Sequence, residues 1–307
     1  MSQYFLGVDG GQSSTTAVIG DQTGRIIGSG RGGSCHDTSV AIRSSVGEAC
    51  RQASLTLEAT RFAAACLGLS GGPAGKEPIL REILRADRMQ VTDDAFIALA
   101  GAMAGQPGII VIAGTGSMGF GRNREGRTAR AGGWGYLFGD EGGAFWIARQ
   151  AVRAALREEE GWGAASGLGP RLLEASGAGS MNDLMHRCYT PEFPRSRVAS
   201  LAVAVHKAAE GGVPAAREIL EDAARELAAL ATGVRGQLFA GGEPALVAWW
   251  GGVFRSPIVL NRFQQLLAAG EGVSVKAGVY QPAIGALLEA YRAAGLDIST
   301  ITPARLP

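Results

Sequence analysis

Near its start the chain reads Tyr4-Phe5-Leu6-Gly7-Val8-Asp9-Gly10-Gly11-Gln12-Ser13-Ser14-Thr15-Thr16-Ala17-Val18-Ile19. A short apolar run ends in Asp-Gly-Gly, passes through small hydroxyl-bearing residues and enters a second run rich in β-branched residues, an order that predicts a β-hairpin. Glycine allows close approach of a ligand to the backbone, and successive N–H groups then form a concavity for anions. The bend is therefore suited to phosphate groups, with the Asp9 carboxylate at its mouth.

A related pattern returns at Ile109-Ile110-Val111-Ile112-Ala113-Gly114-Thr115-Gly116-Ser117-Met118-Gly119-Phe120. Either turn alone is weak evidence, because glycine also favours ordinary hairpin turns. Two such turns, each directly after an apolar strand, predict two facing lobes that grip one nucleotide. Phosphoryl transfer depends mainly on positioning and on charge neutralisation. We therefore interpret the pattern as that of a phosphotransferase.

The composition narrows the class of protein. The 307 residues are 46% hydrophobic and 19% charged, and length alone favours two domains. A net charge of +1 provides no field that would recruit nucleic acid or a membrane surface. The first residues show no signal-peptide pattern, so we expect a cytoplasmic protein. Four scattered cysteines without C-x-x-C spacing indicate neither a metal site nor a disulfide framework.

Strands alternate with helices along the first third, which predicts an α/β layer architecture. Expected strands cover residues 4–8, 15–19, 25–30, 62–67, 89–91, 109–113 and 245–249. Expected helices cover 40–57, 78–86, a segment from 95, 144–160, 198–210, 215–239, 257–269 and 283–294. A hairpin is expected around residues 122–126. The lobe boundary is expected near residues 113–114, giving domains 1–113 and 114–307, with the last helix, about 283–295, packing back on the first lobe.

Two aspartates follow predicted strands. Mg²⁺ prefers one or two carboxylates together with phosphate oxygens and water, so Asp9 is a candidate ligand, although it could also simply close its turn. Asp94 lies between a short strand and a helix, at the carboxyl end of a strand where α/β proteins bind ligands. Its carboxylate could accept a proton from an attacking alcohol. Asp93 or Asp94 could instead cap the helix, and the sequence does not say which does what.

Three further segments are candidates for ligand contacts. Gly132-Gly133-Trp134-Gly135-Tyr136-Leu137-Phe138-Gly139-Asp140-Glu141-Gly142-Gly143-Ala144-Phe145-Trp146 combines rings and carboxylates, which suit a polyhydroxylated ligand. Its acids could also only complement the following helix terminus. Gly251-Gly252-Val253-Phe254-Arg255-Ser256 follows an apolar strand and could approach an adenosine, or form only a tight connection. His36 and Asp37 lie on a predicted loop, where they touch substrate hydroxyls or are merely solvated.

Over essentially its whole length the chain resembles the N-acetylglucosamine kinase and archaeal hexokinase branch of the BadF/BadG/BcrA/BcrD ATPase family, within the actin–hexokinase–Hsp70 superfamily. The run from Gly132 to Ala148 looks like the sugar-site signature of that branch. The resemblance implies two ribonuclease H-like (actin-like ATPase) domains flanking an interdomain nucleotide and sugar cleft. The first loop departs from the usual Asp-Gly-Gly-Gly-Thr-Lys-Thr by lacking one glycine and the basic residue.

The resemblance also implies a role for each matching residue. The catalytic base falls on Asp94. Phosphate-loop roles fall on Gly10, Gly11, Ser13, Thr15, Gly114, Thr115, Gly116 and Ser117. Adenosine-site roles fall on Gly251, Gly252 and Phe254. Sugar contacts fall on Ser34, His36, Thr115 and Asp140, with Asp94 beside the reacting hydroxyl.

These observations predict an ATP-dependent kinase that uses Mg²⁺ and phosphorylates a hexose or amino sugar, with N-acetylglucosamine or glucosamine favoured. One alternative is an iron–sulfur ATPase that activates acyl-CoA dehydratases, which would need cysteine ligands. The other is a sugar or nucleotide sensor without turnover. The expected partner is a small-molecule sugar rather than nucleic acid or membrane, and a homodimer is possible for this kind of kinase.

Overall fold

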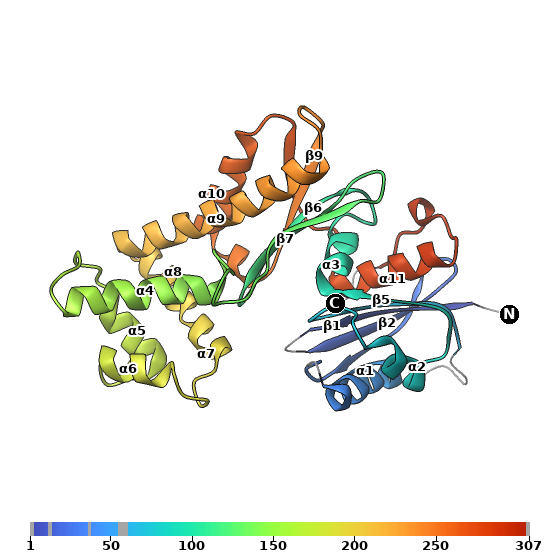
Figure 1. Cartoon of the computed structure of the whole chain (residues 1–307), viewed down its shortest axis with the longest axis horizontal. Coiled ribbons are helices and arrows are strands. Elements are labelled where there is room, and N and C mark those ends of the chain that lie inside the picture. Colours follow the sequence, from blue (N-terminus) through green and yellow to red (C-terminus); the bar gives the residue numbers. More distant parts are fainter. Residues whose placement is uncertain (1–2, 12–13, 36–37, 55–60, 305–307) are drawn as a thin grey trace. The chain divides into compact units, whose positions relative to one another are not determined.

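The computed structural model describes residues 3–11, 14–35, 38–54 and 61–304 (Figure 1). Its contacts divide the chain into two units, Met1–Gly108 with Ala277–Pro307, and Ile109–Lys276. The boundary expected near residues 113–114 falls after strand β6 (Gly108–Ala113), whereas the units divide at its start. The reason is that β6 pairs in parallel with β9 (Ala245–Trp250), so this strand belongs to the sheet of the second unit.

The sheet of the first unit has the strand order β3-β2-β1-β4-β5. Its strands are β1 (Tyr4–Gly10), β2 (Thr15–Asp21), β3 (Ile26–Gly32), β4 (Phe62–Leu69) and β5 (Ala86–Asp93). The first three pair antiparallel as a meander, and β4 and β5 run parallel to β1. The carboxyl ends of β1, β4 and β5 consequently meet at one edge of the sheet.

Both faces of this sheet are covered, which explains why β1 is apolar at nearly every position. Side chains alternate between the faces along a strand. Phe5 packs in the cluster with α3 (Asp94–Ala102) and α11 (Pro282–Ala293), whereas Leu6 packs in the cluster with α1 (Ser39–Ala53) and α2 (Glu77–Ile83). Figure 1 shows these two helix pairs on opposite faces of the sheet.

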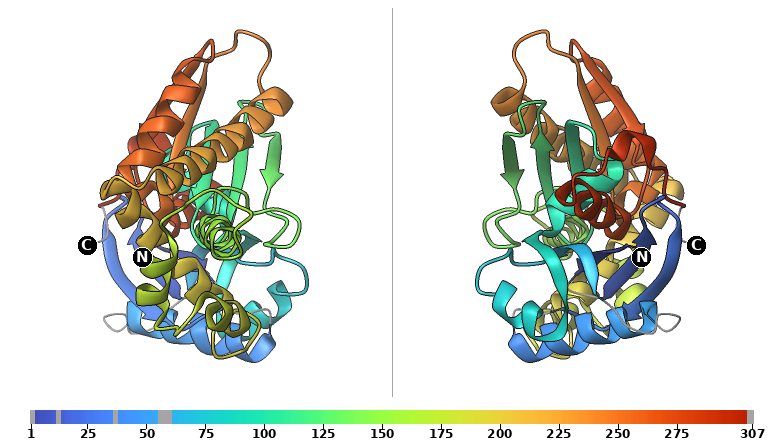
Figure 2. Two further views of the ribbon diagram at one scale, coloured as in Figure 1. Left: turned by 90° about the vertical axis from the view of Figure 1, so that its left-hand side faces the viewer. Right: turned by 90° about the vertical axis from the view of Figure 1, so that its right-hand side faces the viewer.

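Helix α11 packs on α3 and β1, so the last long helix belongs to the first unit (Figure 2). Glycines allow this close approach: a Cβ at Gly7 would overlap the backbone of Leu287, and one at Gly285 would overlap the carbonyl of Ile97. The short helix η2 (Ile298–Thr300) follows. The expected end of the first helix, near Leu57, lies outside the described residues, and α1 ends at Ala53.

The sheet of the second unit has the order β10-β9-β6-β7-β8. Besides β6 and β9 it contains β7 (Ser117–Arg122), β8 (Thr128–Gly132) and β10 (Val273–Ala277). β7 and β8 form the hairpin expected around residues 122–126. The 25-residue helix α9 (Pro214–Leu238) packs against both of these strands and against α10 (Pro257–Ala268).

The remaining helices of this unit form a layer around α4 (Ala144–Glu159), which contacts each of the others. They are α5 (Gly169–Ser176), α6 (Met181–Arg187), α7 (Arg195–Ser200) and α8 (Ala202–Glu210), and the 3-10 turn η1 (Gly252–Arg255) follows β9. One helix was expected over 198–210, whereas the structure has two that meet at Leu201. The short elements α5, α6 and β10 are absent from the expected ranges.

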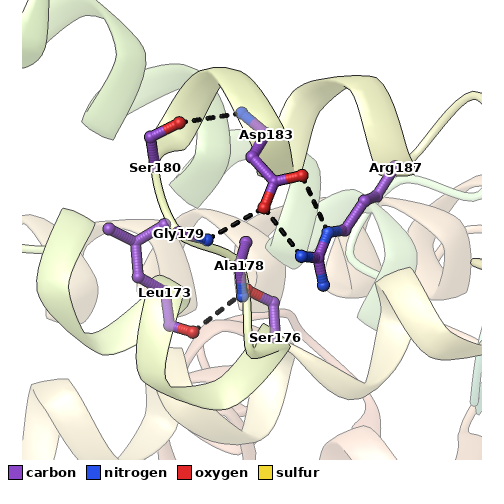
Figure 3. A network of polar contacts seen from close by, with 7 residues as sticks. All are labelled: Leu173, Ser176, Ala178, Gly179, Ser180, Asp183 and Arg187. Carbon is purple, nitrogen blue, oxygen red and sulfur yellow. Dashed lines mark hydrogen bonds and ion pairs between the residues drawn. The ribbon is translucent and has the colours of Figure 1, made fainter.

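Polar contacts hold the corner between α5 and α6 (Figure 3). Ser180 caps α6 by accepting from the Asp183 N–H at 3.1 Å. The Asp183 carboxylate accepts from Gly179 N–H at 2.9 Å and forms a two-pronged ion pair with Arg187. The hydrogen bond from Arg187, helped by the one from Gly179, holds the pKa of Asp183 below its usual value. This exposed network fixes the path of the chain.

Among the residues placed by the structure, no helix combines the length and apolar character needed to cross a membrane.

Candidate active site

Carboxylates gather at the carboxyl edge of the first sheet. Asp9 lies in β1 opposite Gly68 of β4, and Leu69 lies opposite Asp93 of β5. By the strand alternation, Asp9 points to the same face as Phe5, which is the face covered by α3. The first residue of α3 is Asp94. The topology thus brings Asp9 and Asp94 together from positions far apart in the sequence.

The two consecutive aspartates have different partners. Asp93 caps α3, because its carboxylate accepts from the Phe96 N–H at 2.7 Å. The Asp94 carboxylate accepts instead from the Ser70 hydroxyl at 2.8 Å through Oδ2. Ser70 follows β4 directly and was not among the residues singled out in the sequence. Asp93 is therefore committed to the helix terminus, and Asp94 is the residue of the pair that faces the edge of the sheet.

The pKa of Asp9 is raised to about 7, mainly by burial and additionally by the neighbouring negative charge of Asp94. A cation at this position would favour the ionised carboxylate, so the environment fits a metal ion. No cluster of three or more His, Cys, Asp or Glu residues suited to a metal occurs in the described part of the chain. Mg²⁺ takes one or two carboxylates and completes its shell with water and phosphate oxygens.

The first glycine turn joins β1 to β2. Gly11 N–H donates to Ser14 O at 3.0 Å, and the Gly11 carbonyl accepts from the Cys35 N–H at 2.9 Å. Thr15 is fully buried and its hydroxyl donates to Gly33 O at 2.9 Å, which ties the turn to the segment that carries Ser34. Ser13 and His36, together with the Gln12 departure, lie outside the described residues.

The second glycine turn joins β6 to β7 and contacts the start of α4. The Ala144 and Phe145 N–H groups donate to Gly114 O at 2.8 Å and to Thr115 O at 3.0 Å. These contacts satisfy two of the donors that a helix N-terminus leaves unpaired. Helix α4 is thereby locked to the turn, with Gly143 as its N-cap.

Asp140 lies against this turn in a left-handed backbone conformation, with φ of +61°. Its buried carboxylate forms an ion pair with Arg195 of α7 and accepts a long hydrogen bond, 3.4 Å, from the Ser117 N–H. A Cβ at Gly116 would overlap that carboxylate. Thr115, Gly116, Ser117 and Asp140, which were singled out separately in the sequence, therefore form one local group.

Arg195 is the residue of this group that was not expected from the sequence. Its guanidinium lies 5.2 Å from the centre of the Tyr136 ring and 5.8 Å from that of Phe145. No local pattern could have identified it, because 55 positions separate it from Asp140. On the same glycine-rich segment Trp134, Leu137 and Phe138 are exposed.

A cavity of about 420 Å³ lies beside the second glycine turn. It brings Gly114 together with the turn that follows β9, and its lining includes Ile147, His206, Gly252, Val253 and Ser256. This volume lies within the range of small-molecule sites. Gly251, with φ of +113°, passes so close to Ala113 that a Cβ would overlap its carbonyl. Phe254 does not line the cavity and instead packs 5.1 Å from the ring of Phe263 in the core.

Comparisons with known proteins show which family the chain belongs to. Residues 6–290 match the BadF/BadG/BcrA/BcrD ATPase family. The N-acetylmuramic acid/N-acetylglucosamine kinase of Clostridium acetobutylicum is 32% identical over 237 residues, which are 73% of this chain and 77% of that protein. The N-acetyl-D-glucosamine kinase of Dictyostelium discoideum is 28% identical over 252 residues, with the same two shares.

A solved structure gives the corresponding result for the fold. A Chromobacterium violaceum protein, provisionally named an N-acetylglucosamine kinase, superimposes with a TM-score of 0.76 at 27% identity, over 93% of this chain and 98% of that one. Each of the two units is therefore a ribonuclease H-like domain of the actin-like ATPase type, as the sequence predicted.

Proposed function

Because the chain belongs to the BadF/BadG/BcrA/BcrD ATPase family, we propose that it is an ATP-dependent kinase that phosphorylates a hydroxyl of N-acetylglucosamine or a related amino sugar. One observation carries the proposal: Asp94 stands beside Asp9 at the carboxyl edge of the first sheet, in a chain 32% identical to an amino-sugar kinase. A carboxylate there can accept the proton of an attacking alcohol.

Asp94 acts as the general base in this proposal. Its Oδ2 is occupied by the Ser70 hydroxyl, so Oδ1 is the oxygen that accepts the hydrogen bond and then the proton of the sugar hydroxyl. As the O–H bond breaks, the sugar oxygen attacks the γ-phosphorus and the bond from that phosphorus to the β,γ-bridging oxygen breaks, leaving ADP. Asp93 cannot substitute, because the terminus of α3 already engages its carboxylate.

Asp9 is the residue that would hold Mg²⁺, directly or through water. When bound, the ion neutralises charge on the β- and γ-phosphates. The raised pKa of the Asp9 carboxyl supports this assignment, since a cation would offset the cost of its burial beside Asp94. Gly10 and Gly11 present backbone to the same phosphates, and we keep Ser13 and Thr15 as candidate contacts of this loop.

Further contacts come from the second glycine turn and the residues around it. Gly114, Thr115, Gly116 and Ser117 contact the phosphates, and the adjoining cavity accepts the adenosine between this turn and Gly251 and Gly252. Asp140 accepts hydrogen bonds from sugar hydroxyls, with Thr115 beside it. Ser34 and His36 complete the set of proposed sugar contacts. Phe254 is left out, because its ring belongs to the core.

The test is product formation with a panel of acceptors. Purified protein with ATP and Mg²⁺ is given N-acetylglucosamine, glucosamine, N-acetylmuramic acid, glucose or no sugar, and ADP and sugar phosphate are measured by a coupled assay and ³¹P NMR. We expect equal amounts of ADP and sugar phosphate with at least one amino sugar. ADP formed at the same rate without any sugar would contradict the proposal, and so would the absence of turnover with every acceptor.

A further inference from the structure

Ser70 is held at three of its polar groups. Its backbone N–H donates to Gly10 O at 2.9 Å, which joins it to the first glycine turn. Its carbonyl accepts from the Lys76 ammonium at 2.5 Å. Its hydroxyl donates to Asp94 Oδ2 at 2.8 Å. A side chain fixed in this way has little freedom to turn, so the position of its hydroxyl is defined by β1, β4 and α2 together.

The direction of the hydroxyl is informative. Serine hydroxyls in turns commonly bond to backbone groups a few residues away. Here the hydroxyl reaches a side chain 24 positions along the chain, at the first residue of another helix. Closing the turn after β4 does not require this contact, because the backbone of Ser70 already bonds to Gly10 and Lys76. The contact instead fixes one oxygen of the carboxylate and leaves the other for a ligand.

Lys76 is the second unusual feature. It is only 6% exposed. Among the residues that the structure describes, it is the only basic residue that is buried. It lies at the N-cap position of α2, where an ammonium group cannot accept from the backbone N–H groups, and it donates instead to Ser70 O. Burying an ammonium group is costly unless hydrogen bonds compensate. The hydrogen bond from the Lys76 ammonium to Ser70 O thus closes the segment between residues 70 and 76 into a loop.

We infer that Ser70 is a positioning residue that orients the carboxylate of Asp94, and that Lys76 fixes Ser70 for this task. The inference rests on the proposed function, in which Asp94 is the base. Its physical content is simple: the Ser70 hydroxyl holds Oδ2 in place and so sets the direction in which the carboxylate at the first residue of α3 presents Oδ1.

Kinetics with double variants test this role. Ser70→Ala lowers kcat by about tenfold, as expected for the loss of a hydrogen bond to a charged group, and changes KM for sugar and ATP less than about twofold. Ser70→Thr, which keeps the hydroxyl, restores most of kcat. In the Asp94→Asn background Ser70→Ala causes no further loss, because it acts through Asp94. Ser29→Ala, the same change at an exposed position of β3, leaves every parameter unchanged.

Variants of Lys76 test the same role independently, because their effect does not depend on whether a threonine side chain fits at position 70. Lys76→Met lowers kcat and is not additive with Ser70→Ala, whereas Lys76→Arg keeps most of the activity. All variants are first compared with wild type by thermal unfolding. A Ser70→Ala loss of equal size in the wild-type and Asp94→Asn backgrounds would overturn the inference, as would a loss confined to KM.

A spectroscopic readout separates this inference from the proposed function. In protein labelled with ¹³C at the aspartate carboxyl carbons, the Asp94 resonance is identified by its loss in Asp94→Asn. We expect that resonance to shift in Ser70→Ala and to stay in place in Ser29→Ala. An unshifted resonance refutes the positioning role even if the protein phosphorylates a sugar. A shifted resonance without any turnover refutes the proposed function alone.

Discussion

At the scale of single residues, the environment at the edge of the first sheet separates carboxylates that look alike in the sequence. Asp93 is held by a backbone N–H of its own helix, and Asp94 by the hydroxyl of Ser70, which follows β4. Asp9 has no such donor among the hydrogen bonds of the described residues, and desolvation by the surrounding protein raises its pKa to about 7. Proximity to a second negative charge adds to that effect.

The raised pKa of Asp9 predicts a dependence of stability on pH. The pKa of an aspartate is about 3.8 when unperturbed and about 7 here, so the folded protein holds a proton that the unfolded chain releases. The stability that this bound proton contributes is greatest near pH 3.8 and is lost as the pH rises to about 7. The Asp9→Asn variant has no titrating group at this position and does not lose stability in this way. Its free energy of unfolding relative to that of wild type therefore grows from about pH 5 to about pH 8.

The measurement is urea unfolding of both proteins across that pH range, without nucleotide or metal. A difference in unfolding free energy that stays constant with pH would contradict the assigned environment of Asp9.

Arg195 carries a second prediction at this scale. Its guanidinium is the ion-pair partner of the buried Asp140 carboxylate, and removing one member of such a pair leaves an uncompensated charge. We expect Arg195→Gln to raise KM for the sugar by about tenfold or more while KM for ATP changes little. Arg197→Gln is the control, because Arg197 lies on the same helix and stacks 4.8 Å from Phe193 instead. Equal effects of the two variants would argue against a role of the ion pair in sugar binding.

The sequence predicted the acids but not their partners. Asp9 ends an apolar strand before a glycine turn, Asp94 lies between a short strand and a helix, and Asp140 lies in a run of glycines and aromatic residues. All three could therefore be selected from the local sequence. Ser70 and Arg195 could not, because each meets its aspartate only through the fold, across 24 and 55 positions. For the same reason the sequence left open whether Asp93 or Asp94 caps α3, and it placed Phe254 at a ligand although its ring packs in the core.

At the scale of elements, strands with strong apolar runs were predictable and short or interrupted elements were not. β1, β2 and β6 are buried on both faces and read as continuous apolar runs. The break between α7 and α8 at Leu201 has neither glycine nor proline to mark it. α5 and α6 have only eight and seven residues, too few for a clear helical period.

Packing between α3 and α11 gives a prediction at this scale. A Cβ at Gly285 would overlap the Ile97 carbonyl and the backbone of Gly101, so the two helices approach at van der Waals distance. Gly285→Ala should cost about 1–3 kcal/mol of unfolding free energy, because α11 must move away from α3.

Gly236→Ala is the matched control, since Gly236 lies inside α9 with no atom within 4 Å of its added Cβ. There the better helix former should stabilise the protein by up to about 1 kcal/mol. Urea unfolding measures both values. Stabilisation by both substitutions would contradict the close contact of α11 with α3.

At the scale of the whole molecule, the chain builds its first unit from two separate segments. Residues 1–108 supply the sheet and three helices, and α11 returns from the other end to cover one face. A single boundary along the sequence could not reproduce this division. In the sequence, β6 looks like one more strand in the alternation of strands and helices that begins the chain, and only its pairing with β9 assigns it to the second sheet.

The most direct test of this account is the rate of amino-sugar-dependent ADP formation in Asp94→Asn and Asp93→Asn, two isosteric changes at adjacent positions. Asparagine caps a helix as well as aspartate does, so Asp93→Asn should keep both stability and activity near the wild-type level. Loss of the general base should lower kcat of Asp94→Asn by about 100- to 10,000-fold with unchanged thermal stability. Wild-type kcat in Asp94→Asn, or an equal loss in both variants, would contradict the assignment of Asp94 as the base.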